Sequence, residues 1–404
     1  MWRAAAMLLL LAGSATAQTE WRDRLDRTLT LRTPGGTARA DLSGLLDVEG
    51  YYVDRRPPGL VFATGSGVVN PRLSLFLDAW VGRHVYGFVQ ARFDRGFDPG
   101  SPDPSARLDE YLLRYNPLAG PAISVQAGKF ATIVGNFVPR HHSWDNPFVT
   151  APLPYENVTT VSDATVASGP GFFRVRRNLP DRKRLWVPIV WGPSYASGAA
   201  VFGHVGRFDY GAEVKNAALS ARPAVWDATD RGWDQPTTSA RVGWRPSAAW
   251  AFGTSFSSGP YLRSRTETDL PSGTSLDDFR QWLIGADASF ARRHLELWAE
   301  FFAVRFEVPN VGDADTAAWY IEGRYKLTPR LFAALRWNQQ VFGDVETRSG
   351  VDRPWDRDGW RVDSALTWRV DRHVQGKVQY GYFRQVGGLQ QGEQQVAAQV
   401  TVKF

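Results

Sequence analysis

Apolar and polar residues alternate with a period of two along much of the chain. The clearest case is the C-terminal end, where every second residue is apolar: Val396, Ala398, Val400, Val402 and Phe404. The intervening residues, 395–403, are polar or small. Because successive side chains of a strand point to opposite faces, this segment is predicted to be a strand with one apolar and one polar face.

The same alternation recurs in residues 72–81, 208–215 and 361–369, and in each of them the apolar side carries no charge. A shift of the register by one residue would move several charges to the apolar side. If that side faced lipid, each Lys or Arg would cost about 2–4 kcal/mol at the bilayer midplane. The pattern therefore defines the register of these strands.

Seven short turn-like segments separate the alternating stretches, namely 81–84, 116–121, 204–207, 245–247, 291–294, 327–330 and 370–373. Eight longer segments rich in Gly, Pro and Asp lie between them, near 55–70, 95–106, 131–195, 217–236, 258–277, 308–316, 343–358 and 386–393. Membrane β-barrels have short turns at one end and long loops at the other. Both counts predict an all-β fold, a transmembrane antiparallel β-barrel of about sixteen strands with a long third outer loop.

Aromatic residues make up 13% of the chain, with 17 Trp. Several flank the predicted short turns, where amphipathic rings favour the lipid headgroup level. We expect such girdle positions for Trp80, Tyr86, Trp244, Trp250, Tyr325 and Phe332. A secreted, soluble β-sandwich or propeller is the alternative fold.

The first residues are typical of an export signal: a positive start at Met1–Arg3, an apolar stretch over 4–12, and Ala15-Thr16-Ala17 as a cleavage site. We therefore divide the chain into a signal peptide (1–17), a periplasmic N-terminal extension (18–37) and the barrel (38–404). The extension is predicted to be a short helix or a frayed polar terminus. The absence of Cys excludes disulfides, thiolate metal sites, covalent c-type haem and a cysteine nucleophile.

The segment 131–195 is too long for a simple connection and is rich in Pro and aromatic residues. Loops of this length usually have a function, and aromatic residues favour packing over solvation. We expect the loop to fold into the barrel and narrow it. Its candidate constriction residues are basic: Arg140, Arg174, Arg176, Arg177, Arg182, Lys183 and Arg184.

A cationic constriction would favour anions, because charges act strongly in a narrow pore of low dielectric. The alternative is that residues 174–184 lie on the outer surface and contact lipopolysaccharide phosphates. On the barrel strands, the candidate lumen-wall residues are of both signs: Arg72, Arg92, Asp94, Arg241, Arg336 and Lys377. The wall alone therefore predicts no anion or cation preference.

Gly128-Lys129-Phe130, followed by Gly135-Asn136-Phe137-Val138-Pro139, resembles the mid-barrel motif of phosphate-selective-type porins. The resemblance implies a Gram-negative outer-membrane porin with a sixteen-stranded, usually trimeric barrel. The anion pathway of that family uses a Lys-rich site and an Arg ladder. The six Lys of this chain are scattered and its walls are mixed, so phosphate specificity is not implied.

These patterns predict a porin in the bacterial outer membrane that lets small hydrophilic solutes or ions diffuse through a water-filled channel, with lipid and lipopolysaccharide around it. One alternative is a barrel that serves as a scaffold or sheath for a partner protein, such as a multihaem cytochrome. The other is an enzyme or metal site at His141-His142, with Asp145 nearby. No catalytic residue, resident metal or cofactor is expected. No nucleic-acid partner is expected either, because basic and acidic residues are interleaved.

Overall fold

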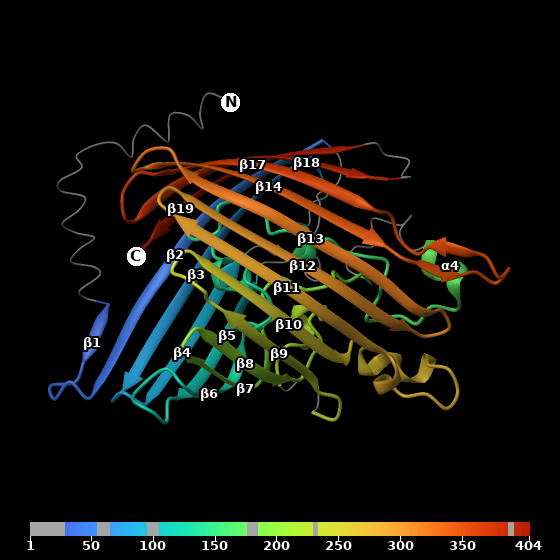
Figure 1. Ribbon diagram of the computed structural model, residues 1–404, viewed down its shortest axis with the longest axis horizontal. Helices are drawn as coiled ribbons and strands as arrows, with labels where there is room; N and C mark the ends of the chain where they lie inside the picture. Colours follow the sequence, from blue (N-terminus) through green and yellow to red (C-terminus); the bar gives the residue numbers. More distant parts are fainter. Residues whose placement is uncertain (1–28, 55–64, 95–104, 176–184, 229–232, 387–391) are drawn as a thin grey trace.

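A single closed β-barrel forms the body of the molecule in the computed structural model, which describes residues 29–54, 65–94, 105–175, 185–228, 233–386 and 392–404 (Figure 1). Sixteen strands form the ring, and a short additional strand brings the sheet to seventeen. Neighbouring strands in the ring are antiparallel. The last strand pairs with the first strand of the ring, with Gln399 opposite Glu49, so the ring has no free edge.

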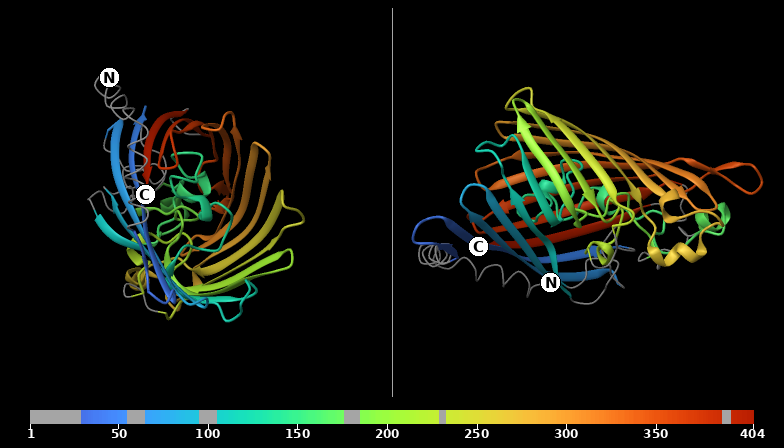
Figure 2. Two further views of the ribbon diagram at one scale, coloured as in Figure 1. Left: turned by 90° about the vertical axis from the view of Figure 1, so that its left-hand side faces the viewer. Right: turned by 90° about the horizontal axis from the view of Figure 1, so that it is seen from below.

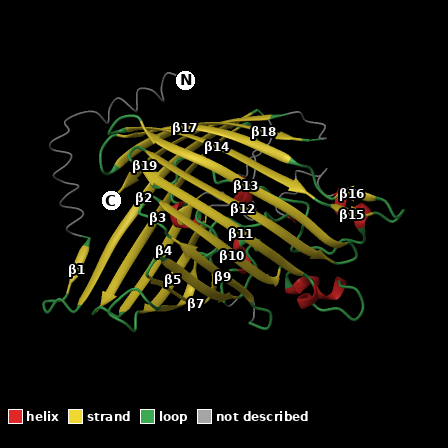
Figure 3. Ribbon diagram, viewed as in Figure 1, coloured by secondary structure: helices red, strands yellow, loops and turns green. Residues whose placement is uncertain are grey.

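The ring contains the following strands: β2 (Ala38–Val53), β3 (Gly67–Val81), β4 (Val85–Asp94), β5 (Ser105–Tyr115), β6 (Ser124–Phe130), β7 (Ala196–Val205), β8 (Phe208–Lys215), β9 (Thr237–Trp244), β10 (Trp250–Pro260), β11 (Arg280–Arg292), β12 (Leu295–Val308), β13 (Gly312–Lys326), β14 (Leu331–Phe342), β17 (Gly359–Arg369), β18 (Val374–Gln385) and β19 (Glu393–Lys403). The remaining elements are short: β1 (Thr30–Arg32), β15 (Asp344–Glu346), β16 (Asp352–Pro354), α3 (Leu153–Glu156), α4 (Pro170–Val175), η2 (Val138–Arg140), η5 (Pro223–Val225), η6 (Ser264–Asp269) and η7 (Leu276–Asp278). Figure 3 shows how few of these elements are helical.

The predicted strand plan is confirmed. Each of the seven short turns joins two consecutive ring strands, and the third long connection runs between Phe130 and Ala196, as expected. The end of the barrel with the short turns is called the turn end below, and the opposite end the loop end. The last described residue, Phe404, lies at the turn end, where its backbone pairs with Gly44.

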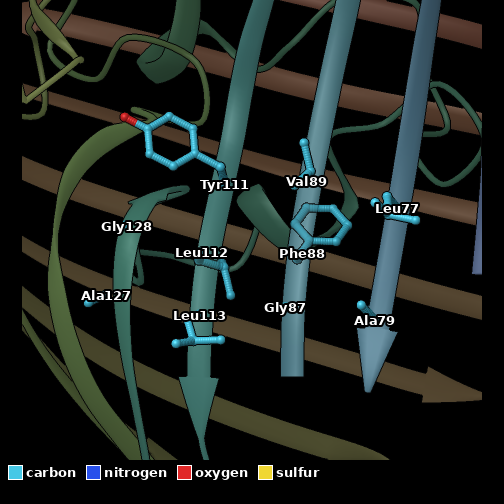
Figure 4. Close-up of a pocket in the computed structure, with 10 residues that line it drawn as sticks. All are labelled: Leu77, Ala79, Gly87, Phe88, Val89, Tyr111, Leu112, Leu113, Ala127 and Gly128. Atoms are coloured by element: carbon cyan, nitrogen blue, oxygen red, sulfur yellow. The ribbon is translucent and has the colours of Figure 1, made fainter. Parts of the chain in front are cut away.

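The alternation of faces is also as predicted. Ile284, Ile321 and Leu335 point outward and are exposed, whereas their strand neighbours point into the barrel. The outer face has a hollow of about 410 Å³ (Figure 4). It forms because the small residues Ala79 and Gly87 point outward beside the larger Leu77 and Leu113. Such a hollow on the apolar face suits lipid chains rather than a polar solute.

The predicted outward position is wrong for three of the six proposed girdle residues. Trp244, Trp250 and Tyr325 are exposed on the outer face, as expected. Trp80, Tyr86 and Phe332 instead occupy inward positions of their strands. Tyr86 donates a hydrogen bond to Asp78 (2.5 Å), while Arg39 stacks on Trp80 and both Arg324 and Arg369 stack on Phe332. The register decides the face of an aromatic residue, and proximity to a turn does not.

Three short strands were not predicted. Within the expected N-terminal extension, β1 pairs with β2, with Thr30 opposite Asp41. The signal peptide and most of the proposed helix lie outside the described residues. At the loop end, β15 and β16 form a hairpin within the connection 343–358. Among the described residues, no helix has the length and apolar character needed to cross a bilayer.

Candidate constriction at the inward-folded loop

Most of the described part of the long loop 131–195 runs inside the barrel (Figure 2). Its two ends lie together, because the Thr132 N–H donates to the Pro193 carbonyl at 3.0 Å. Between these ends the loop contacts the inner faces of strands on most sides of the ring. This position agrees with the prediction that the loop folds inward, and it makes the loop the candidate constriction.

The motif Gly135-Asn136-Phe137 fixes the first part of the loop to the wall. The Glu300 carboxylate on β12 accepts the backbone N–H groups of Asn136 and Phe137 and the hydroxyl of Tyr155 (2.7 Å). Gly135 has φ of 77°, and a Cβ at this position would collide with Glu300 and Tyr155. The residues that carried the family resemblance therefore anchor the loop.

A buried network of charges holds the middle of the loop. Arg140 and Glu156 from the loop pair with Glu322 on β13 and Arg361 on β17, respectively. Arg336 on β14 joins the two pairs, since it lies 3.4 Å from Glu322 and 2.9 Å from Asp363, which also pairs with Arg361. Each buried charge thus has a partner of opposite sign, as burial requires. Arg336 also donates to the carbonyl of Thr150 in the loop (3.2 Å).

Polar side chains of β18 bind the next stretch of loop backbone. The Lys377 ammonium donates to the carbonyls of Ser143, Asn146 (2.6 Å) and Phe148 (3.4 Å). The Gln379 side-chain carbonyl accepts the N–H groups of Val149 (2.7 Å) and Thr150. Together with the network, these contacts leave the lumen faces of β12, β13, β14, β17 and β18 covered by the loop, and we call this the covered wall. Its polar residues are almost completely buried: Glu300, Glu322, Arg336, Asn338, Gln340, Arg361, Asp363, Lys377 and Gln379.

The opposite side of the lumen, the inner faces of β3, β4 and β5, keeps contact with solvent, and we call it the open wall. Three of its Arg side chains pair with buried carboxylates, and their side-chain exposure is 19% for Arg72 and Arg92 and 22% for Arg107. Their carboxylate partners are buried: Asp47, Glu49, Asp94 and Asp109. Water therefore reaches the guanidinium groups more readily than the carboxylates that balance them.

The outer part of the loop returns to the loop end of the barrel. There α4 packs against the connection 343–358, with Phe173 stacked on Trp355 (5.6 Å between ring centroids). Arg174 is half-buried, and its Nε donates to the Pro354 carbonyl at 2.9 Å. Arg174 therefore lies at the loop end, away from the covered wall, which is the position expected if it belongs to the outer surface. Arg176, Arg177, Arg182, Lys183 and Arg184 lie outside the described residues.

The pair His141-His142 is held within the lumen. Burial lowers the pKa of His141 to about 4, so the imidazole is neutral. Its Nδ1–H donates to the Val138 carbonyl and its Nε2 accepts the Tyr195 hydroxyl, each at 2.5 Å. His142 stands edge-on to Phe76. Both nitrogens of His141 thus have partners within the protein, and among the described residues no three His, Asp or Glu side chains are arranged to hold a metal ion.

The six wall candidates all point into the lumen, but they differ in what they do there. Arg336 and Lys377 fix the loop on the covered wall, and Arg72, Arg92 and Asp94 belong to the open wall. Arg241 pairs with Asp287 (2.6 Å) beside a cavity of about 230 Å³ that Ile133 and Pro139 of the loop help to line. Of the loop candidates, Arg140 reaches the covered wall, where Glu322 neutralises it.

The sequence did not single out Arg107. A β-bulge between β4 and β5, at Gln90 and Ala91, shifts the register, so that Gln90 lies opposite Glu110 while Ala91 lies opposite Leu108. The alternation of β5 breaks at the same place, because Asp109 and Glu110 are adjacent acidic residues. That break is the signal that could have revealed the bulge, since a bulge re-aims the side chains around it.

No family model and no curated protein matches the sequence. Solved structures do resemble the fold. The outer-membrane channel DcaP of Acinetobacter baumannii aligns with a TM-score of 0.58 at 12% identity over 93% of this chain and 99% of that one. An anion-selective porin from Comamonas acidovorans aligns with 0.56 at 11% identity over 91% and 100%. OmpT of Vibrio cholerae, in a trimer form, aligns with 0.56 at 10% identity over 91% and 100%. The chain therefore has the sixteen-stranded porin fold.

Proposed function

We propose that the protein is an outer-membrane porin through which small hydrophilic solutes or ions diffuse along the open wall. The observation that carries this proposal is the asymmetry of the lumen. The loop covers the wall from β12 to β18, whereas the guanidinium groups of Arg72, Arg92 and Arg107 remain in contact with water. Sixteen-stranded barrels leave an aqueous lumen, and the loop reduces that lumen to the side of the open wall, where these guanidinium groups still contact water.

The open wall gives the proposed pore a preference for anions. Arg72, Arg92 and Arg107 pair with four buried carboxylates, whereas their own guanidinium groups are partly exposed and therefore closer to the passing ion. In a narrow, poorly screened passage the nearest charges dominate. This preference replaces the cationic loop as the proposed source of selectivity.

We also propose that the barrel lies in a bilayer as a homotrimer. The apolar outer face fits a bilayer, and the trimer form of the V. cholerae protein of the same fold supports a homotrimer for this chain. Arg174 at the loop end supports contact with lipopolysaccharide phosphates. A sheath around a partner protein has no supporting observation, since the loop of the chain itself occupies the lumen that a partner would need.

Purified protein in planar bilayers tests both the pore and its selectivity. We expect stepwise conductance and a reversal potential that indicates anion preference. Replacement of Arg72, Arg92 and Arg107 by Gln should shift the reversal potential toward that of a cation-selective pore, because the carboxylates behind them lose their counter-charges. We expect the anion-to-cation permeability ratio to fall severalfold. The shift should shrink at high salt, where screening shortens the range of each charge.

The matched control is the triple variant Arg174→Gln, Arg348→Gln and Arg353→Gln, which removes the same charge from the loop end. It should leave the reversal potential close to that of the natural protein. Equal shifts in the two variants would contradict a pathway along the open wall, and a barrel that never conducts would contradict the porin proposal.

A further inference from the structure

Cations and aromatic rings alternate around the lumen near the turn end. Arg324 stacks on Trp298 and Phe332 (5.7 Å from each ring centre), and Arg369 stacks on Phe332 (5.2 Å) and on Trp144 of the loop (5.4 Å). Lys403 lies over the same Trp144 ring at 5.5 Å. We call these six residues the collar: Trp144, Trp298, Arg324, Phe332, Arg369 and Lys403. Cation–π contacts explain why they lie together.

The charges of the collar are not balanced. Arg324 has a carboxylate partner, Glu296, at 2.5 Å. Within the described part of the chain, no carboxylate lies at ion-pair distance from Arg369 or Lys403. Among the described residues, the Arg369 guanidinium donates hydrogen bonds to the Gln375 side chain and the Trp144 carbonyl, and both are long, at 3.4 Å. Arg369 and Lys403 share one ring and repel each other. Asp145 offsets this repulsion only in part, because it makes no ion pair with either cation, so an added anion would relieve it.

Water reaches the side chains of the collar. Trp144, Phe332 and Arg369 are partly exposed, and Lys403 is exposed. All of the wall residues of the collar lie on inward positions close to the short turns, at the ends or beginnings of β12, β13, β14, β17 and β19. A solute that has passed the loop would meet the collar before it left the turn end.

We propose that the collar binds small planar organic anions, namely aromatic carboxylates. The carboxylate would lie beside Trp144, where both Arg369 and Lys403 can interact with it, since both lie within 5.5 Å of the centre of that ring. The ring of the ligand would contact the edge of Trp144 or Phe332, because cations already lie over these rings and edge-to-face aromatic pairs also gain energy beyond their buried area. This inference rests on the proposed function, since it names a solute class for the same pore.

The remaining charges near the collar limit the ligand to a single negative group. Asp145, next to Trp144, is exposed and faces Arg369, and Glu296 already occupies Arg324. A second carboxylate on the ligand would meet these acidic side chains. Inorganic phosphate would gain the charge contacts but not the contact with an aromatic ring, so it should bind more weakly than a monocarboxylate with a ring.

Fluorine NMR on the full chain in detergent micelles tests binding without reliance on conduction. The probe is 4-fluorobenzoate, with 4-fluorobenzamide as the neutral ligand of the same shape and fluoroacetate as the anion without a ring.

We expect saturable line broadening of the fluorine signal for 4-fluorobenzoate and not for the two comparison ligands. Arg369→Gln should weaken its binding about tenfold, the range expected for loss of a hydrogen bond to a charged group. Lys403→Gln, at an exposed position that tolerates change, should weaken it in the same direction.

Arg353→Gln, in the exposed hairpin at the loop end, is the control and should bind the probe as the natural protein does. Equal binding of the benzamide, or unchanged binding in both collar variants, would overturn the inference. The two proposals fail separately. A barrel that conducts ions but does not bind 4-fluorobenzoate contradicts only the collar site, and a barrel that binds it but never conducts contradicts the pore.

Discussion

Removal of the inward-folded loop should raise the single-channel conductance severalfold. In this variant, residues 134–192 are replaced by a short Gly-Ser linker. The barrel should close as before, because Thr132 and Pro193 are already joined by a backbone hydrogen bond of 3.0 Å. The polar groups of the covered wall would then face lumen water, which can hydrate them. The expected increase follows from the unobstructed lumen of a sixteen-stranded ring.

The control for loop removal shortens a loop that stays outside the lumen. Replacement of residues 348–350, at the tip of the β15–β16 hairpin, by Asn-Gly should leave the conductance unchanged. Both variants are compared by planar-bilayer recording after a test for the folded barrel by its heat-dependent electrophoretic mobility. If the loop-free barrel conducted no better than the natural protein, the loop could not be the constriction.

The replacement of Arg336 by Met should destabilise the protein by about 3–5 kcal/mol, the usual effect of removing one partner from a buried ionic network. Arg336 is fully buried and lies between Glu322 and Asp363. Its loss leaves both carboxylates short of positive charge and frees Thr150 of the loop. We therefore expect a lower free energy of unfolding in denaturant and noisier open-channel current from a looser loop.

Two companion variants make the Arg336 result specific. Arg353→Met, in the exposed hairpin, should change the free energy of unfolding by less than about 1 kcal/mol. Arg336→Lys keeps the charge but not the planar fork of donors, so it should fall between the two. A cost for Arg336→Met no greater than that for Arg353→Met would show that the network does not hold the loop.

The barrel could be predicted from the sequence because its rules are local. Alternation along β19 or β8 assigns each residue to a face without reference to the rest of the chain. The asymmetry between short turns and long loops then gives the strand number. The predictions that failed used proximity to a turn and did not consider the strand register. Trp80, Tyr86 and Phe332 lie near turns, which suggested the lipid interface, but the register of their strands directs them inward.

The constriction was less predictable because it depends on contacts between distant segments. The loop was expected to fold inward from its prolines and aromatic residues, but nothing in its own sequence distinguishes Arg140, which reaches Glu322 on β13, from Arg174, which remains at the loop end. The covered wall arises only when Lys377 and Gln379 meet loop backbone more than 200 positions away. Such contacts leave no periodic pattern in the sequence.

Cysteine accessibility tests most directly the claim that the loop covers one wall of a water-filled barrel and leaves the other open. The chain has no Cys, so single substitutions report without background. A charged methanethiosulfonate reagent is added during recording to Arg92→Cys on the open wall, to Asn338→Cys on the covered wall and to Leu335→Cys on the outer face. We predict that modification changes the current rapidly at position 92 and leaves it unchanged at 338 and 335. Reaction at position 338 as fast as at position 92 would contradict the account.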